Sequence, residues 1–328
     1  MPDAATRGLS LNLAFVMDPL ERVDVEADTT FALMLAAQAR GHALYYVPPR
    51  ALELDHDHVV LRARRAHVEP VAGRHYRLEP EAALHARDCA AIFLRTDPPV
   101  DVPYLETTWL LSFAEREGVL VVNSPAGVRA ANEKLYALEF AALCPPTAVT
   151  SSVATVRAFM AAHGGEVVVK PLDGHGGFGV LRLHDGDSNI NGIVDLLTLE
   201  GRRPLLVQRY LPEGAQGDRR LHVIDGELRG VLRRVPKAGD HRGNVHVGGR
   251  VEACEPTDAD RALVGAMSAR LRADGLFFVG LDVIGGKLIE VNVTSPTLLQ
   301  ELRRLGGPDL AAEIVAAVEA RASRPRGA

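Results

Sequence analysis

The chain has 328 residues, a length that corresponds to about two domains. Hydrophobic residues make up 47% of it and aromatic residues only 5%, which is typical of a globular protein with an aliphatic core. Its 37 basic and 42 acidic residues leave a formal net charge of −5, which excludes a general electrostatic attraction to nucleic acid or to an anionic membrane surface.

The first third of the chain alternates between strand and helix patterns. Short apolar runs predict strands at 11–17, 43–47, 58–68, 89–95 and 119–123. Helices are predicted between them at 29–40, with Thr29 as the cap, and at 104–117, each followed by a glycine. This order predicts an α/β fold that begins with a doubly wound, mostly parallel sheet.

The remainder of the chain changes character. A helix is predicted from Ser124 into the early 140s, and Cys144-Pro145-Pro146 then breaks the chain near a domain boundary. The later elements are helices at 153–163, near 190–200 and at 258–273, strands at 166–172, 179–183 and 204–211, a hairpin turning at Asp225-Gly226, a hairpin over 277–293, and two closing helices. The glycine-rich segment 237–250 has no periodicity and predicts a mobile loop.

The chain has few lysines and few cysteines, and the cysteine spacing bears on the cellular compartment. The four lysines, against 33 arginines, are Lys134, Lys170, Lys237 and Lys287. The three cysteines are Cys89, Cys144 and Cys254, without the spacing of a zinc site or a redox motif. No apolar run approaches the roughly 18 residues of a membrane span. We therefore expect a cytoplasmic protein with free thiols.

The segment DGHGGFG (173–179) is a candidate phosphate-binding loop. It matches GxGxxG, but a dinucleotide-binding loop requires a following helix, and GVLRL (179–183) alternates as a strand. The pattern therefore predicts a flap between two strands, whose backbone amides can approach phosphates. Lys170 ends the preceding strand, where a compact positive charge is suited to meet a phosphate inside the cleft.

The hairpin at 277–293 carries candidate metal ligands. Asp282, Glu290 and Asn292 are oxygen donors within apolar strands, and buried carboxylates usually have a cation beside them. A two-residue turn at 285–286 would point Asp282 away from Glu290. A three-residue connection, 285–287, with a bulge would set them opposite each other, with Asn292 on the same face. We predict the three-residue connection and a shared Mg²⁺, against the alternative that the carboxylates pair with arginines.

Taken in order, these stretches resemble the ATP-grasp family, and within it the bacterial (prokaryotic-type) glutathione synthetases. The matching stretches cover nearly the whole chain and are FVMDP (15–19), RTDPP (95–99), NEKL (132–135), VVKPLDGHGGFG (168–179), QRYLP (208–212), GDRR (217–220), RGN (242–244), GGR (248–250), FVGLDVIG (278–285) and EVNVTSPT (290–297). Departures from the family pattern include His175 and Phe178 in the flap, where smaller or apolar residues are expected.

The resemblance implies a fold in three parts. Residues 1–130 would form the doubly wound pre-ATP-grasp domain that holds the substrate. Residues 131–205 and 206–328 would form the two α+β subdomains of the ATP-grasp fold, the lid and the catalytic subdomain with the magnesium site. The resemblance also implies a homotetramer.

The resemblance further implies roles for individual residues. Those expected to bind ATP are Lys134, Lys170, Gly174, Gly176, Gly177, Gln208, Tyr210, Leu211 and Asp218. Those expected at the transferred phosphoryl group or over the reaction intermediate are Arg220, Arg234, Arg242 and Asn244. Those expected to hold Mg²⁺, for which Mn²⁺ is a substitute, are Asp282, Glu290 and Asn292. Those expected in the peptide pocket are Asp18, Arg95, Ser295, Pro296 and Thr297.

The reaction implied by the resemblance joins γ-L-glutamyl-L-cysteine to glycine at the expense of ATP, through an acyl phosphate. Three alternatives stay open. Another ATP-grasp ligase would use a different carboxylate or amine. A nicotinamide-dependent oxidoreductase would need a helix after Gly179. A non-catalytic ATP-binding regulator would need to have lost a magnesium ligand, yet all three are present.

Overall fold

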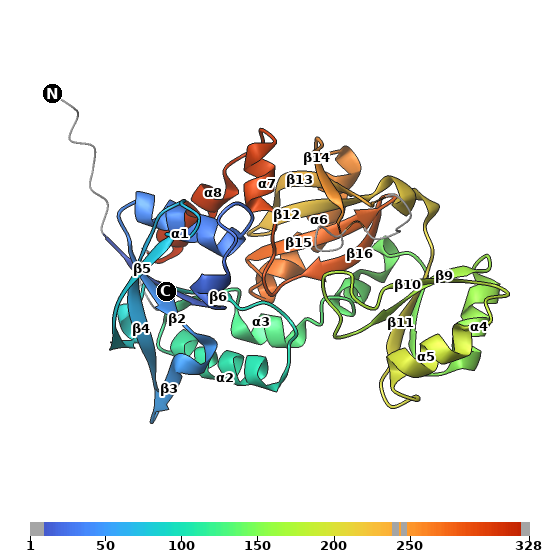
Figure 1. Ribbon diagram of the computed structural model, residues 1–328, viewed down its shortest axis with the longest axis horizontal. Helices are drawn as coiled ribbons and strands as arrows, with labels where there is room; N and C mark the ends of the chain where they lie inside the picture. Colours follow the sequence, from blue (N-terminus) through green and yellow to red (C-terminus); the bar gives the residue numbers. More distant parts are fainter. Residues whose placement is uncertain (1–9, 238–242, 244–247, 323–328) are drawn as a thin grey trace. The chain divides into compact units, whose positions relative to one another are not determined.

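The computed structural model describes residues 10–237, 243 and 248–322 of the chain (Figure 1). The chain forms two compact units. Unit 1 contains the described residues up to Ala130 together with Arg270–Val279 and the residues from Val293 onward, and unit 2 contains Ala131–Ala269 and Gly280–Asn292. The division into parts 1–130, 131–205 and 206–328 stays a prediction. No described helix has both the length and the apolar character needed to cross a membrane.

Unit 1 is built on a mixed seven-stranded sheet. Its strands are β1 (Asn12–Met17), β2 (Ala43–Val47), β3 (Leu52–Asp55), β4 (His58–Val68), β5 (Tyr76–His85), β6 (Ala91–Arg95) and β7 (Leu120–Val122). The order is β3-β4-β2-β1-β6-β7, and β5 also pairs with β4. The pairs β1–β2, β1–β6 and β6–β7 are parallel.

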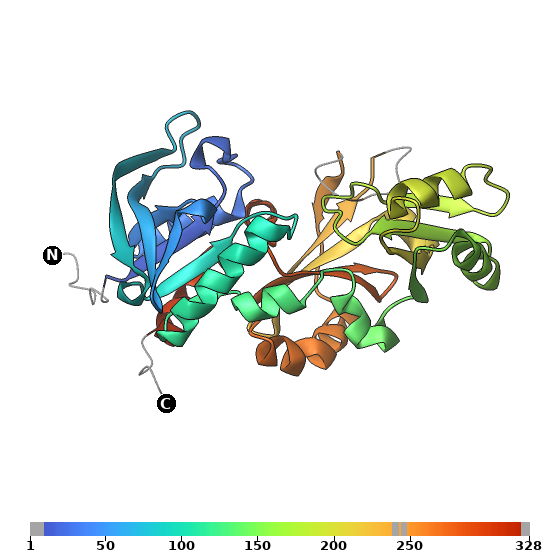
Figure 2. The ribbon, with the colours of Figure 1, turned by 90° about the horizontal axis from the view of Figure 1, so that it is seen from below.

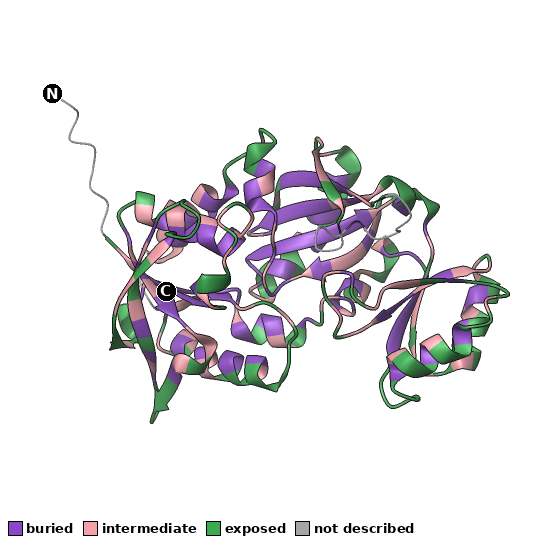
Figure 3. Cartoon of the chain, in the orientation of Figure 1, coloured by how far each residue is buried: buried purple, intermediate pink, exposed green. Residues whose placement is uncertain are grey.

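The prediction of a mostly parallel sheet is wrong for the part of the sheet built around β4. Strand β4 pairs antiparallel with β2, β3 and β5. Strands β3 and β5 were not predicted, because most of their residues are exposed and therefore lack an alternating apolar pattern. The four strands that carry the parallel pairs are predominantly buried, as the purple strands of Figure 3 show.

The helices of unit 1 are α1 (Thr29–Ala39), α2 (Val102–Arg116), α3 (Pro125–Ala130), α7 (Leu299–Arg304) and α8 (Leu310–Ala322). In Figure 2, α2 is the long teal helix and α3 follows it. Asp28, rather than Thr29, caps α1, since its side chain accepts a hydrogen bond from the Phe31 amide at 2.6 Å. The long helix predicted from Ser124 is also wrong, because α3 ends at Ala130 and a separate 3₁₀ segment spans Tyr136–Leu143.

Unit 2 begins with a four-stranded sheet, here named the lid sheet. Its strands are β8 (Thr147–Thr150), β9 (Glu166–Pro171), β10 (Leu181–His184) and β11 (Leu205–Arg209), in the order β10-β9-β11-β8 and all antiparallel. Helices α4 (Val153–Ala162) and α5 (Ile190–Thr198) share a buried core with the strand residues Val167, Val169, Leu183, Leu205 and Val207. Because side chains alternate along a strand, the opposite face carries Lys170 and Gln208.

The third sheet has five strands in the order β14-β13-β12-β15-β16. Their bounds are β12 (Asp218–Ile224), β13 (Glu227–Val235), β14 (Arg250–Ala253), β15 (Phe278–Ile284) and β16 (Lys287–Asn292), and α6 (Asp258–Ala273) lies between β14 and β15 in the chain. The predicted turn at Asp225-Gly226 is confirmed, with Ile224 opposite Glu227. Both turn residues have positive φ, the conformation that tight two-residue hairpins require.

The β15–β16 hairpin reaches the predicted alignment by a different connection. The turn is the two-residue Gly285-Gly286, with Ile284 opposite Lys287, so the predicted three-residue connection is wrong. One pair further along, a bulge adds Ile289 to β16 and sets Asp282 opposite Glu290. Asn292 lies opposite Gly280 on the same strand pair. The prediction that Asp282 faces Glu290 is therefore confirmed, and the bulge rather than the turn produces it.

Candidate active site

A pocket in unit 2 lies between residues of the lid sheet and of the third sheet. It contains about 840 Å³ of space not filled by protein atoms, part of it open to solvent. The predicted site residues that line it are Lys134, Lys170, Gly174, Gly176, Gly177, Gln208, Tyr210, Leu211, Asp218, Arg234, Asp282 and Glu290. All nine residues expected to bind ATP are in this set. Their individual roles stay predictions.

Lys170 enters the pocket from the middle of the lid sheet. Its Nζ donates a hydrogen bond to Gln208 Oε1 at 3.0 Å, and Gln208 Nε2 donates to Thr147 Oγ1 at 2.9 Å. Burial lowers the pKa of Lys170 to about 8, although the nearby Glu290 carboxylate favours the charged form. Because the direct partner of this buried ammonium group is a neutral amide, its positive charge is available to bind an anion.

Lys134 joins the flap to the third sheet. Its Nζ lies 3.1 Å from Glu290 Oε1 and also donates a hydrogen bond to the carbonyl oxygen of Gly174. The turn that carries Lys134 is fixed by Asn132, whose Oδ1 accepts from the Lys134 amide at 3.2 Å and from the Leu135 amide at 3.1 Å. The lysine is thus held over the pocket by its own backbone as well as by its side-chain contacts.

Four charged side chains of the third sheet form one buried network. Asp218 lies opposite Arg234 in the β12–β13 register, and Arg234 Nε donates to Asp218 Oδ1 at 2.6 Å. A terminal nitrogen of Arg234 lies 2.8 Å from Asp282 Oδ2, while Arg220 Nε donates to Asp282 Oδ1 at 2.6 Å. Each of the four residues is at most 8% exposed.

The network sets the protonation of its two carboxylates in opposite directions. Burial alone would raise the pKa of Asp282, but the guanidinium groups of Arg220 and Arg234 hold it well below its usual range. Burial raises the pKa of Asp218, which Arg234 only partly offsets. Arg220 belongs to this network but does not line the pocket itself.

The predicted metal ligands share one strand pair but differ in their partners. Both oxygens of Asp282 contact guanidinium groups, so the alternative pairing with arginines is what the structure shows at this residue. Asn292 Nδ2 donates to the Gly280 carbonyl oxygen at 3.0 Å. Within the described ranges, no three His, Cys, Asp or Glu side chains gather as a metal-binding group. The shared metal stays a prediction.

The glycines of the flap are required by space and by conformation. A Cβ on Gly174 would lie 2.8 Å from Pro171 Cγ and 2.9 Å from the Phe178 carbonyl oxygen. Gly176 and Gly177 have positive φ values of 59° and 82°. Strand β10 follows the flap, so the nicotinamide-dependent alternative lacks the helix it requires. His175 lines the pocket, and Phe178 is 78% exposed.

Sequence reasoning missed several further residues that line this pocket. These are Val168, Val180, Gly214, Gly243, Ile284 and Ile289. Val168 was detectable in principle, because it alternates with Lys170 along β9. Ile289 was not, because only the bulge turns it and Glu290 toward the same side. Arg242 and Asn244 lie outside the described residues.

The residues predicted for the peptide pocket belong to unit 1. Arg95 is 5% exposed, donates from Nε to Thr30 Oγ1 at 3.1 Å and donates from a terminal nitrogen to the Pro296 carbonyl oxygen at 2.9 Å. Burial lowers the pKa of Arg95. Asp18 Oδ2 accepts a hydrogen bond from the Asp97 amide at 2.8 Å. The structure therefore brings Arg95 to the 295–297 segment within this unit.

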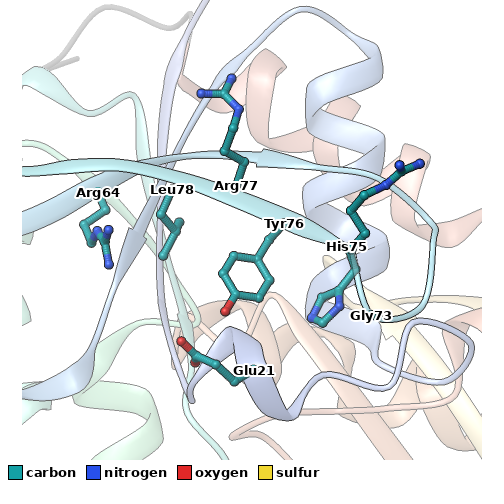
Figure 4. A pocket seen from close by; sticks show the side chains of 8 residues that line it. Glu21, Arg64, Gly73, His75, Tyr76, Arg77 and Leu78 are labelled. Atoms are coloured by element: carbon teal, nitrogen blue, oxygen red, sulfur yellow. The ribbon is translucent and has the colours of Figure 1, made fainter.

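A second hollow in unit 1 was not predicted. It is lined by Glu21, Arg64, Gly73, Arg74, His75, Tyr76, Arg77 and Leu78 (Figure 4). The Tyr76 hydroxyl points to Glu21, whereas Arg77 extends away from both. Burial and the hydrogen bond to Glu21 raise the pKa of Tyr76. The charged groups here do not converge on one point, and no predicted site residue lines the hollow.

Known proteins are similar to this chain over nearly its whole length. The chain matches the family models of the N-terminal domain and of the ATP-grasp domain of prokaryotic glutathione synthetase, over residues 11–129 and 133–307. A glutathione synthetase of Synechococcus elongatus is 44% identical over 321 residues, covering 94% of this chain and 98% of that protein. One of Rhodopseudomonas palustris is 42% identical over 313 residues, covering 95% and 99%.

Solved structures show the same fold at lower identity. A D-cycloserine synthetase superposes with a TM-score of 0.66 at 19% identity, covering 95% of this chain and 100% of that one. A RimK-domain ATP-grasp protein from Sphaerobacter thermophilus gives 0.59 at 24% identity, covering 94% and 99%. At these identities the likeness shows the ATP-grasp fold alone. The two family models and the relatives above 40% identity go further: this chain belongs to the prokaryotic glutathione synthetase family.

Proposed function

We propose that this chain is an ATP-dependent ligase that joins γ-L-glutamyl-L-cysteine to glycine and releases glutathione, ADP and phosphate. Family membership supports this reaction. The structural observation that carries it is the convergence of Lys134, Lys170, Asp282 and Glu290 on one pocket covered by a glycine flap. Lysine ammonium groups neutralise phosphate charge, and carboxylates suit the divalent ion that accompanies ATP.

In the first step, an oxygen of the cysteinyl carboxylate attacks the γ-phosphorus of ATP. The bond from that phosphorus to the bridging oxygen breaks, ADP leaves, and an acyl phosphate remains. We propose that Lys134 and Lys170 hold the phosphates, that Arg234 and Arg220 stabilise charge at the transferred group, and that the Gln208–Leu211 segment and Asp218 hold the nucleoside. This step needs positioning and charge neutralisation rather than a protein nucleophile.

In the second step, the amine nitrogen of glycine attacks the carbonyl carbon of the acyl phosphate. The carbon–oxygen bond to phosphate breaks, and phosphate leaves with the proton that the amine loses. Water must be excluded while the acyl phosphate exists. We propose that Arg242 and Asn244 close over it. We propose the unit 1 residues Asp18, Arg95, Ser295, Pro296 and Thr297 for the peptide.

We propose that Asp282, Glu290 and Asn292 hold Mg²⁺, with Mn²⁺ as a substitute. The fit rests on two hard carboxylate donors set opposite each other in the β15–β16 register. Protein sites for Mg²⁺ commonly supply one or two carboxylates and leave other positions to phosphate oxygens and water. When bound, the ion neutralises charge on the phosphates. Arg220 and Arg234 keep Asp282 ionised and oriented.

Phosphate release from ATP tests the proposal. We expect release that requires γ-glutamylcysteine and rises strongly when glycine is added, with glutathione formed in equal amount. Release that ignores γ-glutamylcysteine would overturn the assigned reaction. Product with alanine but not with glycine would favour the second candidate, another ATP-grasp ligase that joins a different amine.

We also propose, from the family resemblance, a cytoplasmic homotetramer divided into a substrate domain (1–130), a lid (131–205) and a catalytic subdomain (206–328). Light scattering of the purified protein measures the subunit number directly. A mass of one or two subunits at micromolar concentration would contradict the tetramer. Limited proteolysis with and without ADP would report the lid boundaries.

A further inference from the structure

The pocket face of the lid sheet carries an ion pair that the proposed reaction does not use. In the β9–β10 register Arg182 lies opposite Val168 and His184 lies opposite Glu166. Arg182 and Glu166 therefore share the face that carries Val168 and Lys170. A terminal nitrogen of Arg182 lies 2.8 Å from each Glu166 carboxylate oxygen.

The same guanidinium covers an aromatic ring that belongs to the pocket. Arg182 Cζ lies 3.9 Å from the centre of the Tyr210 ring, within the range of a cation–π contact. The Tyr210 amide donates to the Glu166 carbonyl oxygen at 3.2 Å, so backbone and side chain both tie Tyr210 to β9. Tyr210 lines the pocket, whereas Arg182 and Glu166 do not.

The ion pair itself contributes little to stability, because the two side chains are 41% and 40% exposed. Its geometry nevertheless restricts the Tyr210 ring, which would otherwise have free rotamers at the end of β11. A ring that is already ordered loses less entropy when a flat ligand packs against it. Arginine suits this task better than lysine, because its planar group stacks and binds a carboxylate at the same time.

We propose that Arg182, held by Glu166, is a positioning residue that fixes Tyr210 as a wall for the adenine base at this end of the nucleotide pocket. The inference rests on the proposed function, in which the pocket binds ATP. It assigns contact with the adenine base of ATP to Tyr210, and leaves the phosphates of the same ATP to other residues. Lys134 and Lys170 act on the phosphates in the same pocket. A ligand that has a base and a ligand that has only phosphates therefore separate the effect of Tyr210 from the effect of the lysines.

Binding of ADP to the full-length protein tests the inference without requiring turnover. We expect Arg182→Ala to weaken ADP binding about fivefold in calorimetry, the size of the entropy cost of ordering one side chain on binding. Binding of inorganic triphosphate, which has phosphates but no base, should weaken less than twofold in the same measurement. Arg182→Lys should recover part of the loss. Arg157→Ala is the matched control, because Arg157 lies on α4 and contacts Asn191 instead.

A double-mutant cycle separates positioning from a general effect on the lid. In a Tyr210→Leu background, Arg182→Ala should no longer change ADP affinity, because there is no ring left to position. Equal losses for ADP and triphosphate, or undiminished loss in the Tyr210→Leu background, would overturn the proposal. Failure of wild-type protein to bind ADP at all would instead overturn the proposed function.

Discussion

The two sheets that line the pocket of unit 2 present charge to it in opposite ways. The lid sheet contributes Lys170, whose direct side-chain partner is the neutral amide of Gln208. The third sheet contributes Arg234, which shares a buried network with Arg220, and both guanidinium groups are already matched by Asp218 and Asp282. One sheet therefore holds a cation in need of an anion, and the other holds a nearly balanced set of charges.

This difference indicates separate roles for the two sheets. The lid sheet is suited to bind an anionic ligand, and the third sheet is suited to hold its own side chains in fixed positions. Burial lowers the pKa of Lys170, and a bound phosphate, which favours the charged form, can offset that cost. The matched network has no such deficit, so its effect is to fix the positions of Asp282 and Arg234 before any ligand arrives. Preorganised charges of this kind avoid reorganisation during the reaction.

The largest expected effect comes from breaking the matched network. Asp282→Ala would leave Arg220 and Arg234 buried without their shared carboxylate, which should cost about 3–5 kcal/mol of unfolding free energy. Urea denaturation followed by circular dichroism measures the loss. Asp173→Ala, which removes an exposed carboxylate, is the control. A loss below about 1 kcal/mol would show that the network is not a structural unit.

Glu290→Gln should damage the reaction without damaging the fold. Glu290 is less buried than Asp282, and its ion pair joins it to Lys134 alone among the described residues. Loss of this charge should lower turnover by about 10²–10³-fold, the size expected for one preorganised electrostatic group. Steady-state phosphate release and thermal unfolding should be measured together. Near-native turnover would refute the metal assignment.

Lys170 should make stability rise with pH in a defined window. Its pKa is about 8 in the folded chain against an ordinary value of 10.5, so the unfolded chain binds more protons between these values. The burial cost is therefore fully present below pH 8 and is relieved as pH rises toward 10.5. Wild type should gain at most about 3 kcal/mol relative to Lys170→Met across this window. Urea denaturation at several pH values measures the difference, and parallel curves would contradict it.

Nucleotide binding should load a proton onto the same lysine. At pH 8 about half of the Lys170 side chains are protonated in the free protein, and phosphates favour the charged form. ADP binding should therefore take up about half a proton, seen as a dependence of the calorimetric heat on the ionisation enthalpy of the buffer. Lys170→Met should remove this uptake. Uptake that persists in the variant would assign the proton to another group.

Sequence patterns predicted most of the buried strands, because apolar alternation records burial directly. The patterns failed to predict strands that are not buried. Strands β3 and β5 are largely exposed, and their sequences therefore show no sustained alternation of apolar and polar residues. The patterns also failed at Ser124, where apolar residues continue but the helix stops at Ala130. The continuity of a hydrophobic run does not encode continuity of the backbone hydrogen bonds.

Sequence motifs identified the predicted pocket residues, but only part of their geometry could be predicted. Asp282 and Glu290 were expected to face each other through a three-residue connection with a bulge at 285–287, whereas the structure has a two-residue turn and a bulge further along, at Ile289. The alternation of Arg182 along β10 is visible in the sequence. Its stack on Tyr210 is not, because it depends on the register between strands.

The smallest expected effect lies at the edge of the lid. Arg203 contacts Asp173 at 2.9 Å beside the flap, but both side chains are 63% exposed. Solvent screens such a pair, so Arg203→Ala should change unfolding free energy by less than about 0.5 kcal/mol and leave KM for ATP unchanged. Urea denaturation and steady-state kinetics check both values. A rise in KM of tenfold or more would mean that flap charge reaches the nucleotide. The contrast between a lid sheet that supplies the buried cation Lys170 and a balanced third sheet would then be too simple.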